Sequence, residues 1–389
     1  MSASLIIFDT HPIQYRAPVF RELLKKLPGL KVIFFNPQFD GKKWWFQEVD
    51  KIPKQDFGLP LEEGYPNQIL KTQSLGFWEK VKALNRILTE EKPAAVLIYG
   101  YYQMEHWILR FLCSWKKIPI LFVGETFDWR GSALRKKIKK VVVGVFFQRV
   151  SSFIAIGKKT FDYYLSWGVA PSKIIPAKYC TDLAPFFLDE SEAAQCRERT
   201  RRDLGIPLNA FVLLFVGRLF DRKRPQDLLE IHRQLQGKGL VHTVFVGNGE
   251  LSAALETAGQ KLPNLHWVGF KNQKEIKSFY YAADLLVVPS DFETWGLVVN
   301  EAFSCSLPAL VTDQCGVAGD LVISGQTGEI FPVGDCEMAT KKIQPLLADP
   351  TISRKWGQNA RAKVLENYQP AHFARSVVEA FQKATLVEA

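Results

Sequence analysis

Short runs of β-branched and other apolar residues alternate with amphipathic stretches along the whole 389-residue chain. This alternation is typical of βαβ units and predicts parallel sheets covered by helices. A chain of this length exceeds one ordinary hydrophobic core, so we expect two successive doubly wound α/β domains. Strands are expected at 5–8, 31–35, 95–99, 118–123, 152–156 and 174–176, and in a second series at 211–216, 242–246, 265–268, 285–288 and 309–311.

A polar segment, residues 182–202, separates the two series of strands and is rich in Glu and Arg. We interpret it as the linker region, which predicts a first domain at 1–190 and a second at 203–366. The last stretch, 353–386, has the pattern of one or two helices. Its periodicity does not show which domain it joins.

The composition narrows the cellular setting and the range of partners. Six scattered cysteines include no CxxC pair, which argues against a zinc site or a disulfide framework and favours a reduced, cytoplasmic protein. The N-terminus lacks the features of a signal peptide, and no apolar run approaches the roughly 20 residues of a membrane span. The formal net charge of +10 leaves nucleic acid, an anionic membrane surface and phosphorylated substrates open as partners.

The segment DLLVVPSDFETWGLVVNEA, at 284–302, carries the strongest chemical signal. A buried strand ends there, a loop carries Glu293, and Gly296 precedes a helix that holds Glu301. Free amides at a helix N-terminus can bind phosphate, while carboxylates accept hydrogen bonds from hydroxyls. Because carboxylates repel a diphosphate, we expect both glutamates to face sugar hydroxyls. The alternative is one acidic residue in a first helical turn and one solvated surface glutamate.

A second segment follows the strand expected at 211–216. Gly217 and Arg218 open a loop that reaches Lys223, and Pro225 suits the first position of a helix. Two cations beside unpaired amides can bind a diphosphate and stabilise the charge on a departing nucleoside diphosphate. The alternative is a solvated basic turn. The GNGEL turn that begins at Gly247 is a weaker signal.

Together these motifs resemble glycosyltransferase family 4, the glycosyl transferases group 1. The motifs are GRLxxxK at 217–223, GNGEL at 247–251, VGF at 268–270, E-x7-E at 293–301 and CGVAGDLVISGQTGEIF at 315–331. The segment THPIQYRAPVFREL at 10–23 is also similar to members of that family. The resemblance implies the GT-B fold, in which two Rossmann-like doubly wound domains face a central cleft. It also implies that a C-terminal helix, here 367–389, crosses back to the first domain.

The resemblance further implies a donor site for a UDP- or GDP-linked sugar. Arg218 and Lys223 would hold the diphosphate, Glu301 the ribose hydroxyls, and Glu293 the hydroxyls of the transferred sugar. Transfer would retain the anomeric configuration without a metal or other cofactor, which agrees with the lack of an Asp-x-Asp motif. The full set expected at the donor is Gly217, Arg218, Lys223, Gly247, Phe270, Lys271, Glu293, Gly296, Leu297, Val298 and Glu301.

We expect the first domain to bind the acceptor. The motifs that support this expectation are weaker than those of the second domain. Many relatives have a Gly-Gly loop after the first strand, whereas this chain has HPIQY at 11–15, which would contact ligand through side chains. Tyr101 stands where some relatives have a histidine, and the next loop offers Glu125 or Asp128 to orient the acceptor hydroxyl. A solvated carboxylate is the alternative for each. The expected acceptor-side residues are His11, Gln14, Tyr15, Tyr101 and Asp128, and the expected catalytic residues are Glu293, Arg218, Lys223 and Glu125.

Two further segments suit contact with an anionic membrane. A basic run at 135–140 precedes apolar residues at 141–147, and residues 42–46 mix lysine with aromatic rings. The alternative is a helix with a solvated basic face and a buried aromatic turn. Nucleic-acid binding is disfavoured because the basic residues follow no nucleic-acid module.

The interpretation that accounts for most of these features is a retaining glycosyltransferase. It would move a sugar from a nucleoside-diphosphate donor to a glycan or lipid-linked acceptor, in cell-envelope or exopolysaccharide biosynthesis. We expect it in the cytoplasm, as a peripheral protein on the inner face of the membrane. The alternatives are an epimerase or hydrolase of the same fold, and a non-catalytic protein that binds nucleotide sugars or membranes.

Overall fold

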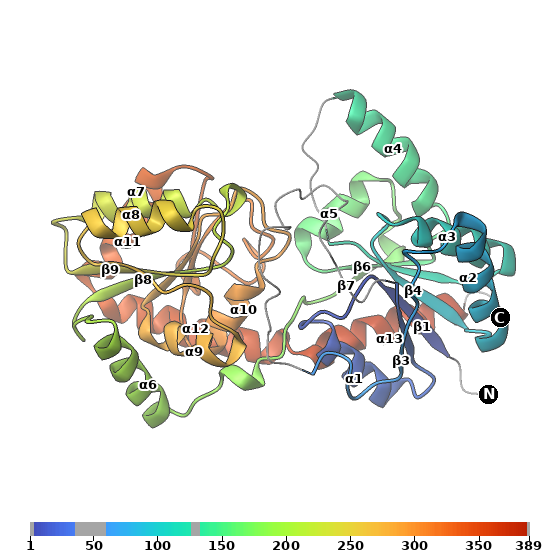
Figure 1. Cartoon of the computed structure of the whole chain (residues 1–389), viewed down its shortest axis with the longest axis horizontal. Coiled ribbons are helices and arrows are strands. Elements are labelled where there is room, and N and C mark those ends of the chain that lie inside the picture. Colours follow the sequence, from blue (N-terminus) through green and yellow to red (C-terminus); the bar gives the residue numbers. More distant parts are fainter. Residues whose placement is uncertain (1–3, 36–59, 126–132, 387–389) are drawn as a thin grey trace. The chain divides into compact units, whose positions relative to one another are not determined.

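The computed structural model describes residues 4–35, 60–125 and 133–386, with the side chains of 133–139 outside the description (Figure 1). These residues form two compact units. The first unit holds the described residues up to Cys180 together with those from Pro370 onward, and the second holds Thr181–Gln369. Each unit is built around its own parallel sheet.

The described strands of the first unit form a parallel sheet in the order β3-β2-β1-β4-β5-β6-β7. Six of these strands confirm the first expected series to within two residues, and these six are short and largely buried. The edge strand β3 was not expected, because its three residues, NQI, include no apolar run. The strands are β1 Leu5–Asp9, β2 Lys31–Phe34, β3 Asn67–Ile69, β4 Ala95–Tyr99, β5 Ile120–Val123, β6 Ser152–Ala155 and β7 Ile174–Pro176.

The helices of the first unit include one from the far end of the chain. They are α1 Ala17–Lys26, α2 Phe77–Glu91, α3 Met104–Lys116, α4 Ala133–Phe147, α5 Lys158–Ser166 and α13 Pro370–Leu386. Helix α13 packs on α1 and on β6, and Figure 1 shows it, in red, beside α1. The buried residues of α13 include Phe373, Val377 and Phe381, which follow one another at helical spacing. The expected return of a C-terminal helix to the first unit is therefore confirmed.

The second unit has a parallel sheet in the order β10-β9-β8-β11-β12-β13. The strand β13 was not expected, because it opens on Gly328 and pairs only at the edge of the sheet. The strands are β8 Phe211–Val216, β9 Val241–Val246, β10 Leu265–Trp267, β11 Leu285–Val288, β12 Ala309–Thr312 and β13 Gly328–Phe331. The helices are α6 Glu190–Asp203, α7 Pro225–Leu235, α8 Ser252–Lys261, α9 Gln273–Ala282, α10 Leu297–Ser304, α11 Cys336–Ala348 and α12 Pro350–Asn367.

The order of the strands determines where each unit can bind a ligand. In the first sheet the order reverses between β1 and β4, and in the second between β8 and β11. Helices on the two sides of such a point cross to opposite faces of the sheet, which opens a crevice at the carboxyl ends of the two strands. The loops after β1, β4, β8 and β11 therefore border the candidate sites.

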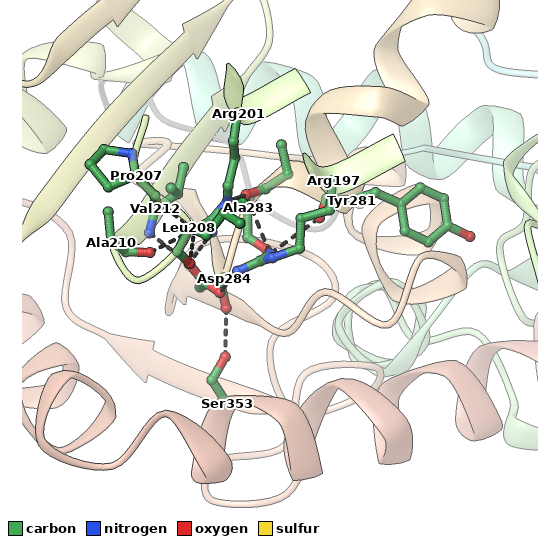
Figure 2. A network of polar contacts seen from close by, with 11 residues as sticks. Arg197, Arg201, Pro207, Leu208, Ala210, Val212, Tyr281, Ala283, Asp284 and Ser353 are labelled. Carbon is green, nitrogen blue, oxygen red and sulfur yellow. Dashed lines mark hydrogen bonds and ion pairs between the residues drawn. The ribbon is translucent and has the colours of Figure 1, made fainter. Parts of the chain in front are cut away.

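The polar segment expected as a linker holds helix α6 instead. The reason is that Arg201 is an internal donor: Figure 2 shows it directed at Asp284 and Ala210. Arg201 is 0% exposed and donates to Asp284 Oδ2 at 2.7 Å and to the carbonyls of Ala282 and Ala210. Arg197 donates to the other oxygen of the same carboxylate at 2.6 Å. Charged residues in α6 are thus internal partners of the unit 2 fold. Composition alone cannot separate such residues from a solvated linker.

None of the described helices combines the length and the apolar character that a membrane span requires.

Candidate functional site

Three loops meet at the carboxyl edge of the unit 2 sheet and are joined through their backbones. The Leu219 amide donates to Asn248 O at 3.0 Å. The Gly247 amide donates to Gly269 O at 2.8 Å. A side chain at Gly247 is excluded, because a Cβ there would lie 1.9 Å from Gly217 O. The GNGEL and VGF segments therefore hold the loop that follows β8 in one position.

Arg218 extends from this loop as a cation without a protein partner. It is exposed, and its guanidinium forms no hydrogen bond or ion pair with the part of the chain that the structure describes. A guanidinium on a fixed backbone can form two parallel hydrogen bonds to a phosphate. The geometry thus presents a ready anion-binding group at the crevice of unit 2.

Lys223 and Glu293 form an ion pair across the same edge. The Lys223 ammonium donates to Glu293 Oε2, and both side chains are about four-fifths buried, with 20% and 19% exposed. Burial, with the guanidinium groups of Arg222 and Arg218 nearby, lowers the pKa of Lys223 to about 8. The charge of Cys315 opposes that shift. Two residues expected to bind different parts of a donor therefore contact each other.

The loop that carries Glu293 leads into the N-terminus of α10. Gly296 precedes the helix with φ +106°, a left-handed conformation that suits glycine. The amides of Leu297 and Val298 open the helix, and amides in a first turn have no acceptor within the helix. Such amides favour a bound anion.

The CGVAG segment forms backbone hydrogen bonds with the loop that carries Glu293. The Gly316 amide donates to Glu293 O at 2.9 Å, and the Val317 amide donates to Trp295 O at 3.0 Å. A Cβ on Gly316 would lie 2.1 Å from Thr294 O, so only glycine fits. This motif thus fixes the backbone of the Glu293 loop.

Glu301 lies one turn into α10 and is 7% exposed. The hydroxyl of Tyr280, on α9, donates to Glu301 Oε2 at 2.7 Å. Burial raises the pKa of Glu301 to about 7, and the hydrogen bond from Tyr280 opposes the shift. Glu301 Oε1 accepts no hydrogen bond from the described residues, so it can accept one from a ligand hydroxyl. Tyr280 was missed by the sequence analysis, since nothing in the pattern of α9 links it to α10.

Phe270 and Lys271 lie between β10 and α9, directly after Gly269, and both are half-buried. The Lys271 ammonium lies 4.0 Å from Glu275 Oε1 and 6.0 Å from the centroid of the Phe279 ring. The structure therefore places both residues at the same edge as the GNGEL turn. Their expected contact with a nucleobase remains a prediction.

In unit 1, the loop after β1 holds His11, Gln14 and Tyr15, as expected, and places Tyr15 against Tyr179, which the sequence analysis did not connect with them. Gln14 Oε1 is buried and accepts no hydrogen bond from the described residues. Burial raises the pKa of Tyr15, whose ring packs edge-on against Tyr179 at 5.7 Å. His11 Nδ1 lies 2.8 Å from Thr10 Oγ1, and burial lowers the pKa of His11. These residues thus form part of a largely buried polar cluster at the carboxyl edge.

Tyr101 and Asp128 are the two other residues expected on the acceptor side. Tyr101 is 7% exposed and its ring packs in the unit 1 core, 6.1 Å from Phe122 and 6.2 Å from Phe146. The structure thus gives its ring a packing role. Asp128 lies outside the described residues, as do residues 42–46 and the side chains of 135–139.

Residues 196–363 match the family described as glycosyl transferases group 1. Over nearly its full length, the chain also resembles a crystal structure of HepE from Anabaena in complex with UDP-glucose. The TM-score is 0.73 and the identity 18%, over 97% of this chain and 99% of that one. The chain has the GT-B fold.

Two curated relatives match part of this GT-B chain. Alpha-maltose-1-phosphate synthase of Mycolicibacterium smegmatis is 27% identical over 201 residues, 48% of this chain and 52% of that protein. D-inositol 3-phosphate glycosyltransferase of Corynebacterium efficiens is 30% identical over 201 residues, 49% of this chain and 47% of that protein. The chain therefore spans about half the length of the curated relatives it matches.

Proposed function

We propose that this GT-B chain is a retaining, metal-independent glycosyltransferase of family 4. It would move a sugar from a nucleoside-diphosphate sugar to a glycan or lipid-linked acceptor, in cell-envelope or exopolysaccharide biosynthesis. The observation that carries the proposal is the pairing, at one sheet edge, of the unpartnered cation Arg218 with the half-satisfied carboxylate Glu301. A nucleoside diphosphate offers an anion to the first and ribose hydroxyls to the second.

The family match and the fold support this proposal. The matched segment, 196–363, includes the whole set of donor candidates, and the HepE structure was determined with UDP-glucose. A UDP-linked sugar is therefore the first donor to test.

The proposed reaction breaks the bond between the anomeric carbon and the diphosphate oxygen, whose electron pair leaves with the diphosphate. The acceptor oxygen bonds to the anomeric carbon on the same face, and its proton passes to the departing phosphate. Arg218 would stabilise the charge that grows on the diphosphate, together with the α10 amides. Lys223 would join them once the sugar hydroxyls engage Glu293, because the ion pair must then rearrange. These two cations would neutralise charge where other transferases use a metal.

Measurements of nucleoside diphosphate binding and of donor turnover test the proposed donor site separately from the acceptor site. We expect calorimetry to detect UDP or GDP binding by the wild-type chain and a loss of about 1–3 kcal/mol in Glu301→Ala, because a charged hydrogen bond disappears. Glu256→Ala, which removes an exposed carboxylate from α8, is the matched control and should bind as the wild type does. Absence of any nucleoside diphosphate binding, and of its release from UDP- and GDP-sugars, would refute the proposal. The anomeric configuration of the product, read by NMR, tests retention.

We also propose peripheral contact with an anionic membrane on the cytoplasmic side, supported by exposed apolar residues on α3 and α4. Phe111 and Trp115 on α3 are 64% and 70% exposed, and Val141 and Val145 on α4 are 69% and 42% exposed. Arg110 on α3 donates to Val145 O at 2.6 Å, so the two helices lie side by side. This α3–α4 face carries apolar groups that can enter the interface of a bilayer beside cations that attract its headgroups.

Liposome flotation tests this contact. We expect the chain to float with vesicles that contain phosphatidylserine at low salt, and Trp115→Ser to weaken that binding. Leu208→Ser is the control, because Leu208 is 60% exposed but belongs to unit 2. No flotation at low salt, or equal losses in both variants, would contradict a membrane role for the α3–α4 face.

A further inference from the structure

A cation and two carboxylates meet at the carboxyl edge of the unit 1 sheet. Asp9 is the last residue of β1, Arg16 caps α1, and Glu125 follows β5. Arg16 donates through Nη1 to Asp9 Oδ1 and through Nη2 to Glu125 Oε1, the latter at 2.6 Å. These side chains border the point between β1 and β4 where the strand order reverses.

The Arg16 guanidinium is buried, and its Nε donates no hydrogen bond to the described residues. Its carbon lies 4.2 Å from the centroid of the Tyr99 ring, and only 10% of its side chain is exposed. Asp9 is 0% exposed. A buried group of this kind contributes little stability on balance, because desolvation offsets the attraction between the charges. Its position at the crevice therefore favours a functional role.

Glu125 differs from Asp9 in its exposure: Asp9 Oδ2 also accepts no hydrogen bond from the described residues, but it is buried, whereas the Glu125 side chain is partly exposed. Its Oε1 accepts from Arg16 and also from the hydroxyl of Tyr179, which follows β7. Its Oε2 accepts no hydrogen bond from the described residues, and 26% of its side chain is exposed. Two donors on one oxygen fix the plane of the carboxylate and so the direction of the other oxygen.

We propose that Glu125 Oε2 accepts the hydrogen bond of the attacking hydroxyl in the bound substrate complex, before that proton passes to the departing phosphate during transfer, and that Arg16 and Tyr179 are positioning residues that orient the Glu125 carboxylate. The ligand class follows from charge: one cation between two carboxylates leaves a net negative cluster, which favours a neutral hydroxyl over an anion. The inference rests on the proposed transferase function, because the attacking hydroxyl belongs to that reaction. It adds Arg16 and Tyr179 to a site for which the sequence offered Glu125 alone.

His11 provides a readout in solution that needs no substrate. Burial is the main cause of its lowered pKa; Asp9 and Glu125 raise the pKa, and Arg16 lowers it. In an NMR titration of the histidine rings, we expect the His11 midpoint to rise in Arg16→Met and to fall in Glu125→Gln. Arg16→Lys, which keeps the charge, should lie between the wild type and Arg16→Met, and remains informative if the methionine variant does not fold. Glu105→Gln, which breaks a separate buried pair with Lys80, is the control and should leave the midpoint unchanged.

Hydrolysis of UDP-glucose without an acceptor tests whether Glu125 orients the attacking group. In this reaction water takes the place of the acceptor hydroxyl. We expect kcat to fall about 100-fold in Glu125→Gln, in the range of lost general acid–base or orienting groups. Tyr179→Phe and Arg16→Lys should lose about tenfold, with unchanged affinity for UDP.

Failure of this inference is distinguishable from failure of the proposed function. If the wild type binds neither UDP nor GDP, and releases neither from UDP- or GDP-sugars, the proposed function fails. If it binds UDP and hydrolyses UDP-glucose, and the Glu125 and Tyr179 variants hydrolyse it equally well, the positioning proposal is overturned. A His11 midpoint that is the same in wild type, Arg16→Lys and Glu125→Gln also overturns it, whatever the turnover.

Discussion

The hydroxyl of Tyr280 donates to Glu301 Oε2 at 2.7 Å, from α9 to α10, and leaves the second oxygen of that carboxylate open. Because Glu301 is buried, folding raises its pKa from 4.5 to about 7. The carboxyl group that we assign to the ribose hydroxyls therefore titrates within the physiological range.

We predict that UDP binds more tightly at pH 8 than at pH 6, because only the ionised carboxylate accepts from both ribose hydroxyls. Glu301→Gln should lose most of this dependence, and calorimetry on both proteins separates it from the titration of UDP itself. Tyr280→Phe removes a bond to the ionised form, so it should raise the pKa further and move the transition to higher pH. A pH dependence that is equal in wild type and Glu301→Gln would contradict the assignment.

The same shift predicts how stability depends on pH. Between pH 4.5 and about 7, the folded state binds more protons at Glu301 than the unfolded state does. The free energy of unfolding should therefore fall as pH rises through this window, and level above it. Glu301→Gln removes this contribution, so its urea-unfolding free energy minus that of the wild type should increase from pH 5 to pH 7. A constant difference would show that the carboxyl group titrates normally.

The ion pair of Lys223 with Glu293 predicts opposite effects on two ligands. Glu293→Gln releases Lys223 from its partner, so we expect UDP to bind about threefold to tenfold more tightly, as for a gain of roughly 1 kcal/mol. The same change should abolish most turnover of the sugar donor, because the sugar hydroxyls lose their carboxylate. Glu250→Gln, an exposed neighbour in the GNGEL turn, should change neither quantity. Weaker UDP binding in Glu293→Gln would argue that the pair acts as one preformed unit.

Gly316 allows a test of the loop that carries Glu293. A Cβ at this position would lie 2.1 Å from Thr294 O, a backbone atom that cannot rotate away. We expect Gly316→Ala to lower the free energy of unfolding by about 2 kcal/mol or more and to impair donor turnover. Gly144→Ala, in helix α4 with nothing within 4 Å of its Cβ, should be neutral or stabilising by about 0.5–1 kcal/mol. Equal melting temperatures for both variants would contradict this account of the CGVAG motif.

The sequence predicted the parallel sheets and the strand ends that border the crevices, because apolar runs and turn residues are local signals. It did not predict Tyr280 beside Glu301, or Arg16 and Tyr179 beside Glu125, because each contact joins segments that meet only after folding. The GNGEL glycines illustrate the same limit. Their motif was visible, but their role as a backbone support for the 217–219 loop depends on a contact with Gly217 O.

Arg201 gives the clearest example, since it lies in the polar segment that was expected to be the linker region. Arg201 is 0% exposed and donates to Asp284 (Figure 2). Among the described residues, its neighbour Arg202, whose side chain is 71% exposed, pairs with Glu198 one turn away. We expect Arg201→Ala to lower the free energy of unfolding by about 3–5 kcal/mol, because the largely buried Asp284 carboxylate loses one of its two guanidinium partners and several carbonyls lose a buried donor. Arg202→Ala should cost less than about 0.5 kcal/mol. Urea unfolding followed by circular dichroism measures both, and similar losses in the two variants would mean that α6 is not anchored through Asp284.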